Sequence, residues 1–196
     1  MEQDQRDRLI AALATSIEER GYRDTTVADI VRIAKTSRRT FYEHFRDRDA
    51  CFLVLFAETI AQTMQLVAEA VDPGRSWDEQ VEEAIDAYID SLGSRPALHQ
   101  SFVRELPSLG SDGAEQQRLV TERFAQALVD LVEAGRHEQH DVEIAPLSFD
   151  AAIIIVGGLR ELMVISLQHG RRLSDLRDSI IRVVKAILVG GGSTRG

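Results

Sequence analysis

The chain has 196 residues, four prolines, one cysteine and a formal net charge of -9 at pH 7. This length can bury a sizeable core, and a single cysteine excludes an internal disulfide and with it the disulfide-rich class of secreted domains. No apolar run reaches the length of a membrane-spanning helix, and the N-terminus has no signal-peptide core. We therefore expect a cytoplasmic protein without a membrane partner, and the scarcity of strand-like alternation predicts an all-α fold.

The negative charge lies mainly outside the N-terminal quarter. Residues 1–48 hold ten Lys and Arg against nine Asp and Glu, whereas residues 49–196 hold thirteen against twenty-three. Within residues 32–48 the basic side chains are Arg32, Lys35, Arg38, Arg39, Arg46 and Arg48. A local positive patch is what counterion release on nucleic acid requires, and a distant acidic region weakens non-specific binding. The alternative interpretation is an ordinary solvated face.

Two helices are predicted before residue 35. The first ends at Gly21, a residue suited to the position just after a helix, and the second begins near Thr26, which forms a capping-box pattern with Asp29. The apolar face of the first consists of Leu9, Ile10, Leu13, Ala14 and Ile17. The apolar face of the second consists of Val27, Ile30, Val31 and Ala34.

A third short helix follows a break at residues 35–37. Ser37 is a good N-cap, and Phe41 and Phe45 recur at i and i+4. Two short helices joined by a tight turn predict a helix-turn-helix. The outer face of the third helix is rich in hydrogen-bonding groups, namely Arg38, Arg39, Thr40, Tyr42, Glu43 and His44. An apolar anchoring side and a polar outer side are typical of a helix that reads base edges in the major groove.

Six further helices are predicted after residue 46. The first begins at the N-cap Asp47 and ends before Pro73, the second has its apolar face between Val81 and Leu92, and the third opens at residues 94–96. The others are expected at about residues 114–136, 147–169 and 174–189. Residues 137–146 read as a surface loop and residues 191–196 as a disordered tail. Three helices form an N-terminal head, and about six form the larger remainder.

A motif of fixed spacing runs through the head. It consists of Gly21-Tyr22, Thr25–Val27, Asp29-Ile30, Ala34, Ser37, Thr40–Phe45 and Asp47-Arg48. In this motif, which covers about the first quarter of the chain, the sequence resembles the DNA-binding segment of the tetracycline-repressor (TetR) family. Three positions depart from the family pattern, which usually has glycine, a small apolar residue and leucine where this chain has Lys35, Thr36 and Cys51. If the turn requires a positive φ, Lys35 bears a strain that glycine avoids.

The resemblance implies a ligand-responsive transcription regulator and no enzyme. It implies a DNA-binding domain at residues 1–48 and a ligand-binding and dimerisation domain at residues 49–190, with a homodimer formed through the last two helices. Such a regulator, by family habit a repressor, binds a palindromic double-stranded operator and is released by a small molecule; no metal or other cofactor is expected. Two half-sites are also favoured physically, because one short helix reads few base pairs. The alternative is that the apolar helix at 147–169 is only the core of a monomer.

Roles on DNA follow from side-chain chemistry and from the resemblance. Ser37 caps the recognition helix, whose N-terminal amides favour phosphate. Arg38 and Arg39 are the best candidates for base contact, and Thr40 suits a thymine methyl group or a phosphate. The residues expected to hold phosphates are Thr26, Lys35, Tyr42, His44 and Arg48, with His44 alternatively an ordinary exposed histidine.

A small apolar or aromatic effector of unknown identity is expected between the helices of the second domain. Its candidate apolar contacts are Phe56, Ile60, Met64, Tyr88, Phe102, Leu106, Phe124 and Met163, and its candidate polar contacts are His99, Gln100 and Arg160. For each residue alone the alternative is a role in the core, since aromatics at helical spacing are usually core.

Other chemistry is weakly indicated. His137 and His140 lie near acidic residues and could hold a metal, but their segment lacks cysteine and helical period. Cys51 could be a redox-sensing thiol, although a buried small apolar residue is the simpler interpretation. A rival class of function is a helical ligand-binding or enzymatic protein whose N-terminal helices only pack and do not bind DNA.

Overall fold

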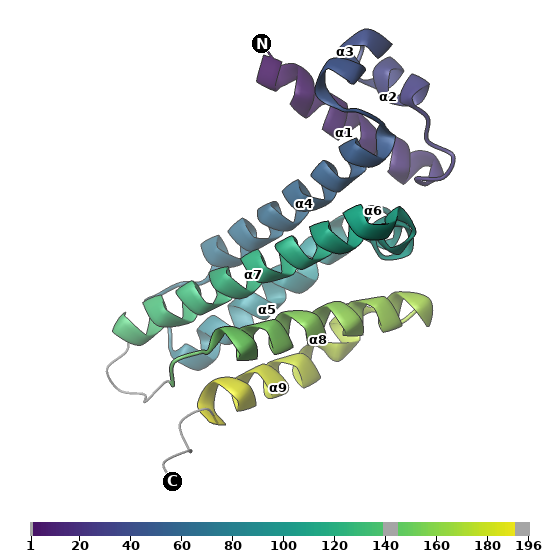
Figure 1. The fold of residues 1–196 in the computed structure, drawn as a ribbon. Coiled ribbons are helices and arrows are strands. Elements are labelled where there is room, and N and C mark those ends of the chain that lie inside the picture. Colours follow the sequence, from purple (N-terminus) through teal and green to yellow (C-terminus); the bar gives the residue numbers. More distant parts are fainter. Residues whose placement is uncertain (1, 139–144, 191–196) are drawn as a thin grey trace. The chain divides into compact units, whose positions relative to one another are not determined.

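The computed structural model describes residues 2–138 and 145–190, and these residues form nine α-helices, two 3-10 turns and no strand (Figure 1). In chain order the elements are α1 (Glu2–Arg20), α2 (Val27–Ile33), α3 (Arg38–His44), α4 (Arg48–Ala70), α5 (Trp77–Ser94), α6 (Pro96–Glu105), η1 (Leu106–Leu109), α7 (Gly110–Glu138), α8 (Phe149–Gln168), η2 (Leu173–Leu176) and α9 (Arg177–Gly190). The expected all-α fold, with three helices in the head and six after it, is confirmed.

The helices divide into two compact units. Unit 1 comprises Met1–Ile60 and Arg95–Arg118, and unit 2 comprises Ala61–Ser94 and Leu119–Gly196. Helices α4 and α7 therefore each begin in unit 1 and end in unit 2. We predicted a DNA-binding domain at residues 1–48 and a ligand-binding and dimerisation domain at residues 49–190. This is a division by function and not by packing, and it stays a prediction. The predicted tail, 191–196, lies outside the described residues.

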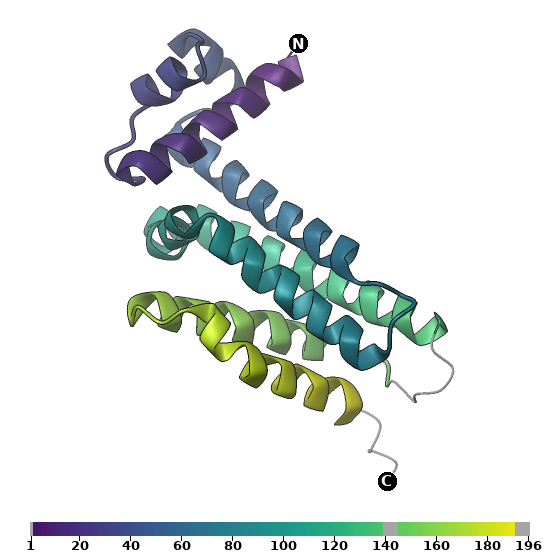
Figure 2. The same ribbon diagram turned by 180° about the vertical axis from the view of Figure 1, so that it is seen from behind.

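Unit 1 is held together by apolar side chains from five helices. Leu9, Leu13, Ile30, Phe41, Phe52 and Leu98 are all fully buried. The Phe52 ring lies 4.2 Å from Tyr22 and 5.4 Å from Phe102, measured between ring centroids. Each such side chain contributes about 1.5–3 kcal/mol through burial. Helix α6 thus shares one core with the three N-terminal helices, whose arrangement is visible from two sides in Figures 1 and 2.

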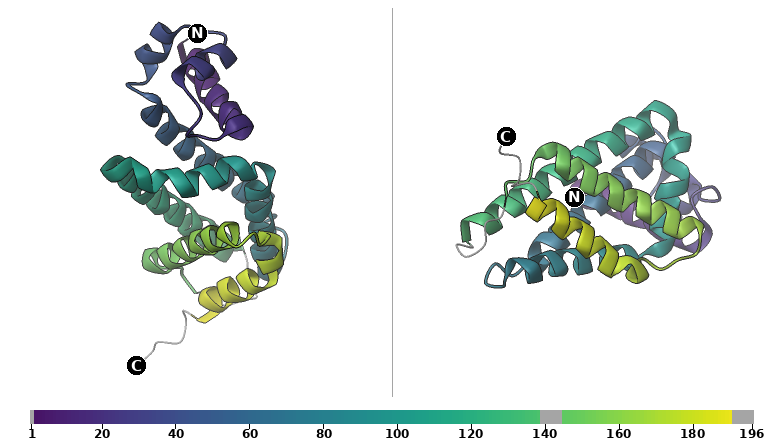
Figure 3. Two further views of the ribbon diagram at one scale, coloured as in Figure 1. Left: turned by 90° about the vertical axis from the view of Figure 1, so that its right-hand side faces the viewer. Right: turned by 90° about the horizontal axis from the view of Figure 1, so that it is seen from below.

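Unit 2 has its own core, built from α5, α7, α8 and α9. Its buried members are Trp77, Val81, Ile85, Ala125, Val132, Leu147, Ala152, Ile155, Val156, Ile180, Ile181, Val184 and Leu188. Ion pairs add a polar link between α5 and α9: Arg177 Nη2 lies 2.7 Å from Asp86 Oδ2, and Lys185 Nζ lies 2.9 Å from Glu82 Oε1. The views in Figures 1, 2 and 3 agree that α8 and α9 lie side by side.

The boundaries of α7 differ from those expected. The helix begins at Gly110 and not near residue 114, and it continues to Glu138. Gly110 has a φ of 60°, which lets the chain turn directly from η1 into α7. A Cβ on Gly113 would lie 2.2 Å from the Leu106 carbonyl oxygen, so this close approach requires glycine. The remaining part of the predicted loop, residues 139–144, lies outside the described residues.

Helix α4 is long and apolar enough, by length and composition, to cross a membrane. This differs from our expectation that no segment would reach that threshold. Length and composition alone do not distinguish a membrane helix from a buried core helix. In α4 the side chains of Phe52, Leu55 and Phe56 are at most 4% exposed, which is what a core helix requires.

Candidate nucleic-acid interface

The N-terminus of α2 is fixed by the predicted capping box. The Thr26 hydroxyl accepts the Asp29 amide at 3.3 Å, and the Thr26 amide donates to Asp29 Oδ2 at 3.1 Å. The Thr26 hydroxyl also donates to Asp29 at 2.6 Å, and this bond is the main cause of the lowered pKa of the Asp29 carboxyl. Since the Thr26 hydroxyl is engaged in this box, a phosphate contact would compete with it; that contact stays a prediction.

The turn between α2 and α3 does place Lys35 in the left-handed region, with a φ of 51°. The Lys35 amide donates to the Arg32 carbonyl at 3.3 Å, and the Thr36 amide donates to the Val31 carbonyl at 2.9 Å. This pair of bonds is the Schellman motif, in which the left-handed position is usually glycine. The expected strain at Lys35 is therefore present.

Lys35→Gly is expected to raise the free energy of unfolding by roughly 0.5–1 kcal/mol. The left-handed conformation costs a residue with a Cβ about 1–2 kcal/mol, and part of the gain is offset by the greater unfolded-state entropy of glycine. Chemical denaturation measures the change. Lys35→Ala is the matched control, because it removes the same charge but keeps the Cβ. Equal stability of the glycine and alanine variants would contradict the assignment.

Helix α3 has a buried side and an exposed side, as predicted. The Ser37 hydroxyl accepts the Thr40 amide at 3.1 Å and so caps the helix. Phe41 is fully buried, whereas Tyr42 is 57% exposed. The other predicted DNA contacts on this segment fall into two groups. The exposed ones are Lys35, Ser37, Arg38 and Arg39, and the half-buried ones are Thr40 and His44.

Among the arginines of this surface that form an ion pair, Arg39 has the most exposed side chain. Its side chain is 89% exposed and its Nε lies 3.0 Å from Glu43 Oε1, one turn along the helix. An exposed pair at this spacing contributes only about 0.3–0.5 kcal/mol. Glu43 therefore orients Arg39 without preventing its transfer to a nucleic-acid acceptor.

Arg48 has a structural role that the sequence did not indicate. Its Nη1 donates to the carbonyl oxygens of Tyr22 at 3.1 Å and Thr25 at 2.7 Å, and its guanidinium carbon lies 4.1 Å from the centre of the Tyr22 ring. The Tyr22 hydroxyl donates to Asp49, and burial raises the pKa of this phenol. Arg48 thus fixes the connection between α1 and α2, and its predicted phosphate contact stays a prediction.

Three ion pairs join the head to α6, to its N-cap residue Arg95 and to α7 within unit 1. Arg23 Nε lies 3.1 Å from Glu105 Oε1, Arg95 Nε lies 2.7 Å from Glu18 Oε1, and Arg46 pairs with Asp112. Arg46 belongs to the positive patch, so part of that patch is neutralised internally. Sequence reasoning could not find these pairs, because the partners are 66 to 82 residues apart.

The candidate effector contacts divide between the two units. Tyr88 and Phe124, whose ring centres are 6.0 Å apart, line a cavity of about 70 Å³ in unit 2, and Met163 packs against the cluster around Tyr88. In unit 2, Met64 is half-buried and Arg160 exposed, and neither lines the cavity. The candidates in unit 1, which do not line it either, are Phe56, Ile60, His99, Gln100, Phe102 and Leu106. All of these effector contacts stay predictions.

The cavity also involves residues that we did not predict, notably Trp77 and Gln80. The sequence signal for them is the capping box Ser76-x-x-Glu79 at the start of α5, in which Ser76 donates its amide to Glu79 at 3.0 Å. With the helix start so placed, the period of α5 turns Trp77, Gln80 and Val81 inward. Gln80 is unusual on that buried face because its side chain is an amide.

The structure describes one of the two alternative sensing sites, the Cys51 thiol, and leaves the His137/His140 segment untested. Cys51 is fully buried, and burial raises the pKa of its thiol to about 12, so the reactive thiolate is disfavoured at neutral pH. Among the described residues there is no group of three or more potential metal ligands from His, Cys, Asp and Glu. The side chains of His137 and His140 lie outside the described residues.

Comparison with known proteins shows a match in the N-terminal part of the chain and a similar fold over nearly all of it. The family model described as bacterial regulatory proteins, tetR family, matches residues 9–55. Over 97% of both chains the fold is similar to that of the fatty acid degradation regulator FadR from Bacillus halodurans, with a TM-score of 0.73 and 19% identity.

Two further solved structures share the fold. The transcriptional regulator FadR from Bacillus subtilis, in complex with stearoyl-CoA, has a TM-score of 0.71 and 18% identity over 94% of this chain and 98% of that one. A TetR transcriptional regulator from Rhodococcus sp. RHA1 has a TM-score of 0.72 and 17% identity over 96% of this chain and 98% of that one.

Proposed function

We propose that this chain, whose residues 9–55 match the family model of bacterial regulatory proteins, tetR family, is a ligand-responsive repressor of that family that binds a palindromic operator as a homodimer. The observation that carries the proposal is the two-sided α3, with Phe41 fully buried and Arg38, Arg39 and Tyr42 exposed. A rigid helix with exposed guanidinium groups suits hydrogen bonding to base edges in the major groove.

The DNA contacts that we propose follow the exposure of each group. Arg38 and Arg39 reach guanine O6 and N7, and Thr40 contacts a thymine methyl group or a phosphate. The phosphate contacts are Thr26, Lys35, Tyr42, His44 and Arg48, together with the capped N-terminus at Ser37. Because Arg46 and Arg48 already have partners within unit 1, most of the electrostatic attraction falls to Lys35, Arg38 and Arg39.

Exposed apolar side chains support a dimer through α8 and α9. Ile154, Gly158, Leu162 and Ile165 recur along one face of α8, and the three large ones are 39–66% exposed. Val183 on α9 is 58% exposed. A contiguous exposed apolar surface usually marks an interaction site, and a second copy of the same surface is a self-complementary partner. Outside the backbone of α8 itself, a Cβ on Gly157 or Gly158 would meet no described atom within 4 Å, which leaves room for a partner helix.

The apolar cavity of unit 2 supports release by a small apolar or aromatic effector. The FadR of Bacillus subtilis was solved with stearoyl-CoA, so a protein of this fold accepts an apolar chain. The effector would release DNA only if it binds the DNA-free state more tightly than the DNA-bound state. Helices α4 and α7, which pass from unit 1 to unit 2, offer a covalent route for that coupling.

Arg39→Ala is expected to weaken binding to the operator by roughly tenfold to a hundredfold, because a bidentate arginine–guanine contact contributes about 1–3 kcal/mol of discrimination. Binding to scrambled duplex should weaken far less, and thermal stability should stay near that of the parent. Fluorescence anisotropy at several salt concentrations, with DNA from beside the gene, measures both affinities. Arg118→Ala is the control, because Arg118 on α7 is also an exposed arginine, at 52%, and also forms an ion pair within its own helix, with Glu115.

Two results of this experiment would contradict the proposal. An unchanged ratio of operator to scrambled affinity in Arg39→Ala would remove Arg39 from base readout. Absence of any salt-sensitive complex with the parent protein, even in dilute buffer, would favour the rival class, a helical ligand-binding or enzymatic protein that does not bind DNA.

A further inference from the structure

The cavity in unit 2 is almost entirely apolar. Its lining comes from α4, α5, α7, α8 and α9 and from Val71 just after α4, and most of the side chains are aliphatic or aromatic; Trp77, Gln80 and Tyr88 are among them. No charged side chain is among them, so the cavity offers no counter-ion to a carboxylate or phosphate. Side-chain polar atoms come only from Trp77, Gln80 and Tyr88.

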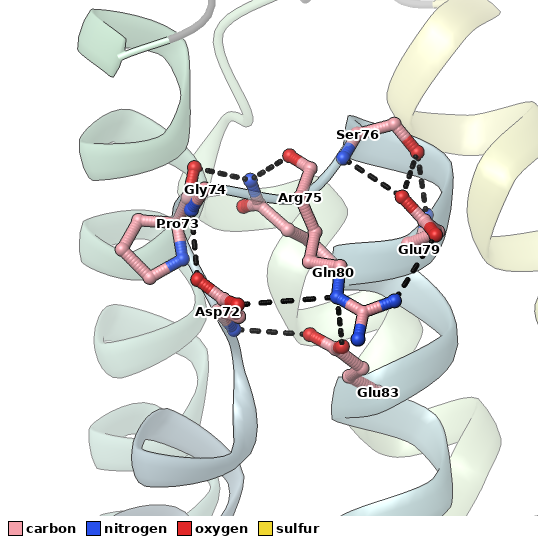
Figure 4. A network of polar contacts seen from close by, with 8 residues as sticks. All are labelled: Asp72, Pro73, Gly74, Arg75, Ser76, Glu79, Gln80 and Glu83. Atoms are coloured by element: carbon pink, nitrogen blue, oxygen red, sulfur yellow. Dashed lines mark hydrogen bonds and ion pairs between the residues drawn. The ribbon is translucent and has the colours of Figure 1, made fainter.

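Gln80 is 4% exposed and is held from one side only. Its Nε2 donates to the carbonyl oxygens of Pro73 at 3.3 Å and Arg75 at 3.0 Å (Figure 4). Because both partners are acceptors, the amide must turn its NH₂ group toward them, and Oε1 faces the other way. Among the residues that the structure describes, none donates a hydrogen bond to Oε1.

The loop that holds Gln80 is itself well ordered by hydrogen bonds. The Gly74 amide donates to Asp72 at 2.9 Å, the Asp72 amide donates to Glu83 at 3.0 Å, and the Ser76–Glu79 capping box fixes the start of α5 (Figure 4). The carbonyls of Pro73 and Arg75 are therefore fixed in position, and the Gln80 amide is preorganised. A site that is ordered in advance loses less entropy when a ligand binds.

Gly135 leaves space beside the free acceptor. A Cβ at this position on α7 would lie 3.3 Å from Gln80 Oε1 and 2.9 Å from the Trp77 ring. Any side chain larger than glycine would therefore crowd the oxygen. Gln80 is thus a side chain of 4% exposure whose Oε1 has a fixed orientation and accepts no hydrogen bond from a described residue.

We propose that Gln80 Oε1 accepts a hydrogen bond from the effector, so that the effector is an uncharged apolar molecule with one hydroxyl or N–H group. This inference rests on the proposed function, in which an effector occupies the unit 2 cavity. A ligand that fills the cavity shields Oε1 from water, and an acceptor shielded without a donor is costly, so a ligand that supplies the donor binds better than an analogue of the same size that cannot. Gln80 is then the residue that determines specificity in an otherwise apolar cavity.

The test compares 1-hexanol with its isomer methyl pentyl ether, which has the same atoms but no donor. Trp77 is the one tryptophan of the chain and lines the cavity, so its emission reports occupancy. We expect the alcohol to bind the parent protein about fivefold to tenfold more tightly than the ether. Gln80→Met, which keeps the length of the side chain but has no amide, should bind both isomers alike.

Two further variants make the test specific. Tyr88→Phe removes the one hydroxyl group of the lining and should keep the preference for the alcohol. Gly135→Ala keeps Gln80 but places a methyl group 3.3 Å from Oε1 and 2.9 Å from the Trp77 ring, so its binding is measured by calorimetry and not by Trp77 emission; it should weaken the alcohol more than the ether. This second variant keeps the test valid if Gln80→Met is poorly folded by circular dichroism.

Each contrary outcome has a distinct meaning. Equal binding of the two isomers by the parent protein, or loss of the preference in Tyr88→Phe with retention in Gln80→Met, would overturn the role of Gln80 and leave the effector cavity intact. If neither isomer alters Trp77 emission, the cavity takes no such ligand and the inference fails. The salt-sensitive DNA complex, measured without effector, would in either case still test DNA binding separately.

Discussion

Ile154→Glu is expected to convert a dimer into a folded monomer and to weaken operator binding by roughly a hundredfold or more, since one head then reads one half-site. Ile154 is 66% exposed, so a glutamate there is solvated in the isolated chain and should not disturb the unit 2 core. In the proposed interface the same residue would be buried twice, once from each protomer. Two carboxylates would then lose water without gaining partners, which costs several kcal/mol.

Sedimentation equilibrium measures the dimer, and anisotropy measures the operator affinity. Leu66→Glu is the matched control, because Leu66 is 51% exposed and apolar but lies on α4. The control should remain dimeric and bind DNA like the parent. A dimer that persists in Ile154→Glu and dissociates in Leu66→Glu would place the interface elsewhere.

Phe41→Ala is expected to lower the stability of unit 1 by about 3–5 kcal/mol and to abolish DNA binding. Phe41 is fully buried, and its ring centre lies 5.7 Å from that of Phe45. Helix α3 has only seven residues, which is too short to be stable in water without packing. Loss of its buried anchor should therefore disorder the surface that carries Arg38 and Arg39.

Circular dichroism during urea unfolding measures the loss, and Trp77 emission follows unit 2 in the same samples. Tyr42→Ala is the control on the opposite face of α3, since Tyr42 is 57% exposed. It should change the stability of the chain by about 0.5 kcal/mol or less while still lowering DNA affinity through the predicted phosphate contact. If Phe41→Ala kept both the unfolding midpoint and DNA affinity, the anchoring role of α3's buried side would be wrong.

The number of arginines available to DNA is smaller than the charge of the head suggests. Arg23, Arg46 and Arg48 are engaged within unit 1, with Glu105, with Asp112 and with the carbonyls of Tyr22 and Thr25. Arg48→Ala should consequently lower stability as well as DNA affinity. A measured loss of affinity in that variant cannot be assigned to a phosphate contact without the unfolding curve beside it.

Much of the fold was determined by local patterns in the sequence. The capping boxes of α2 and α5, the cap at Ser37 and the breaks at Gly21 and Pro73 depend on residues no more than a few positions apart. The apolar periods likewise fix which side of each helix is buried, and Phe41 and Phe45 were found in this way. The sequence indicated strain at Lys35 only on the condition that the turn requires a positive φ, and the structure meets that condition.

The tertiary structure alone decided which distant groups meet. Arg48 turns inward to two carbonyls because α4 begins against the α1–α2 connection, and α6 joins the core of the head through Leu98 and Phe102. Gln80 became a candidate recognition group only when the loop at residues 73–75 was seen to occupy its NH₂ group. The helical period of apolar residues predicts which face of a helix is buried. It does not predict which element covers that face, since this depends on the packing of elements far apart in the chain.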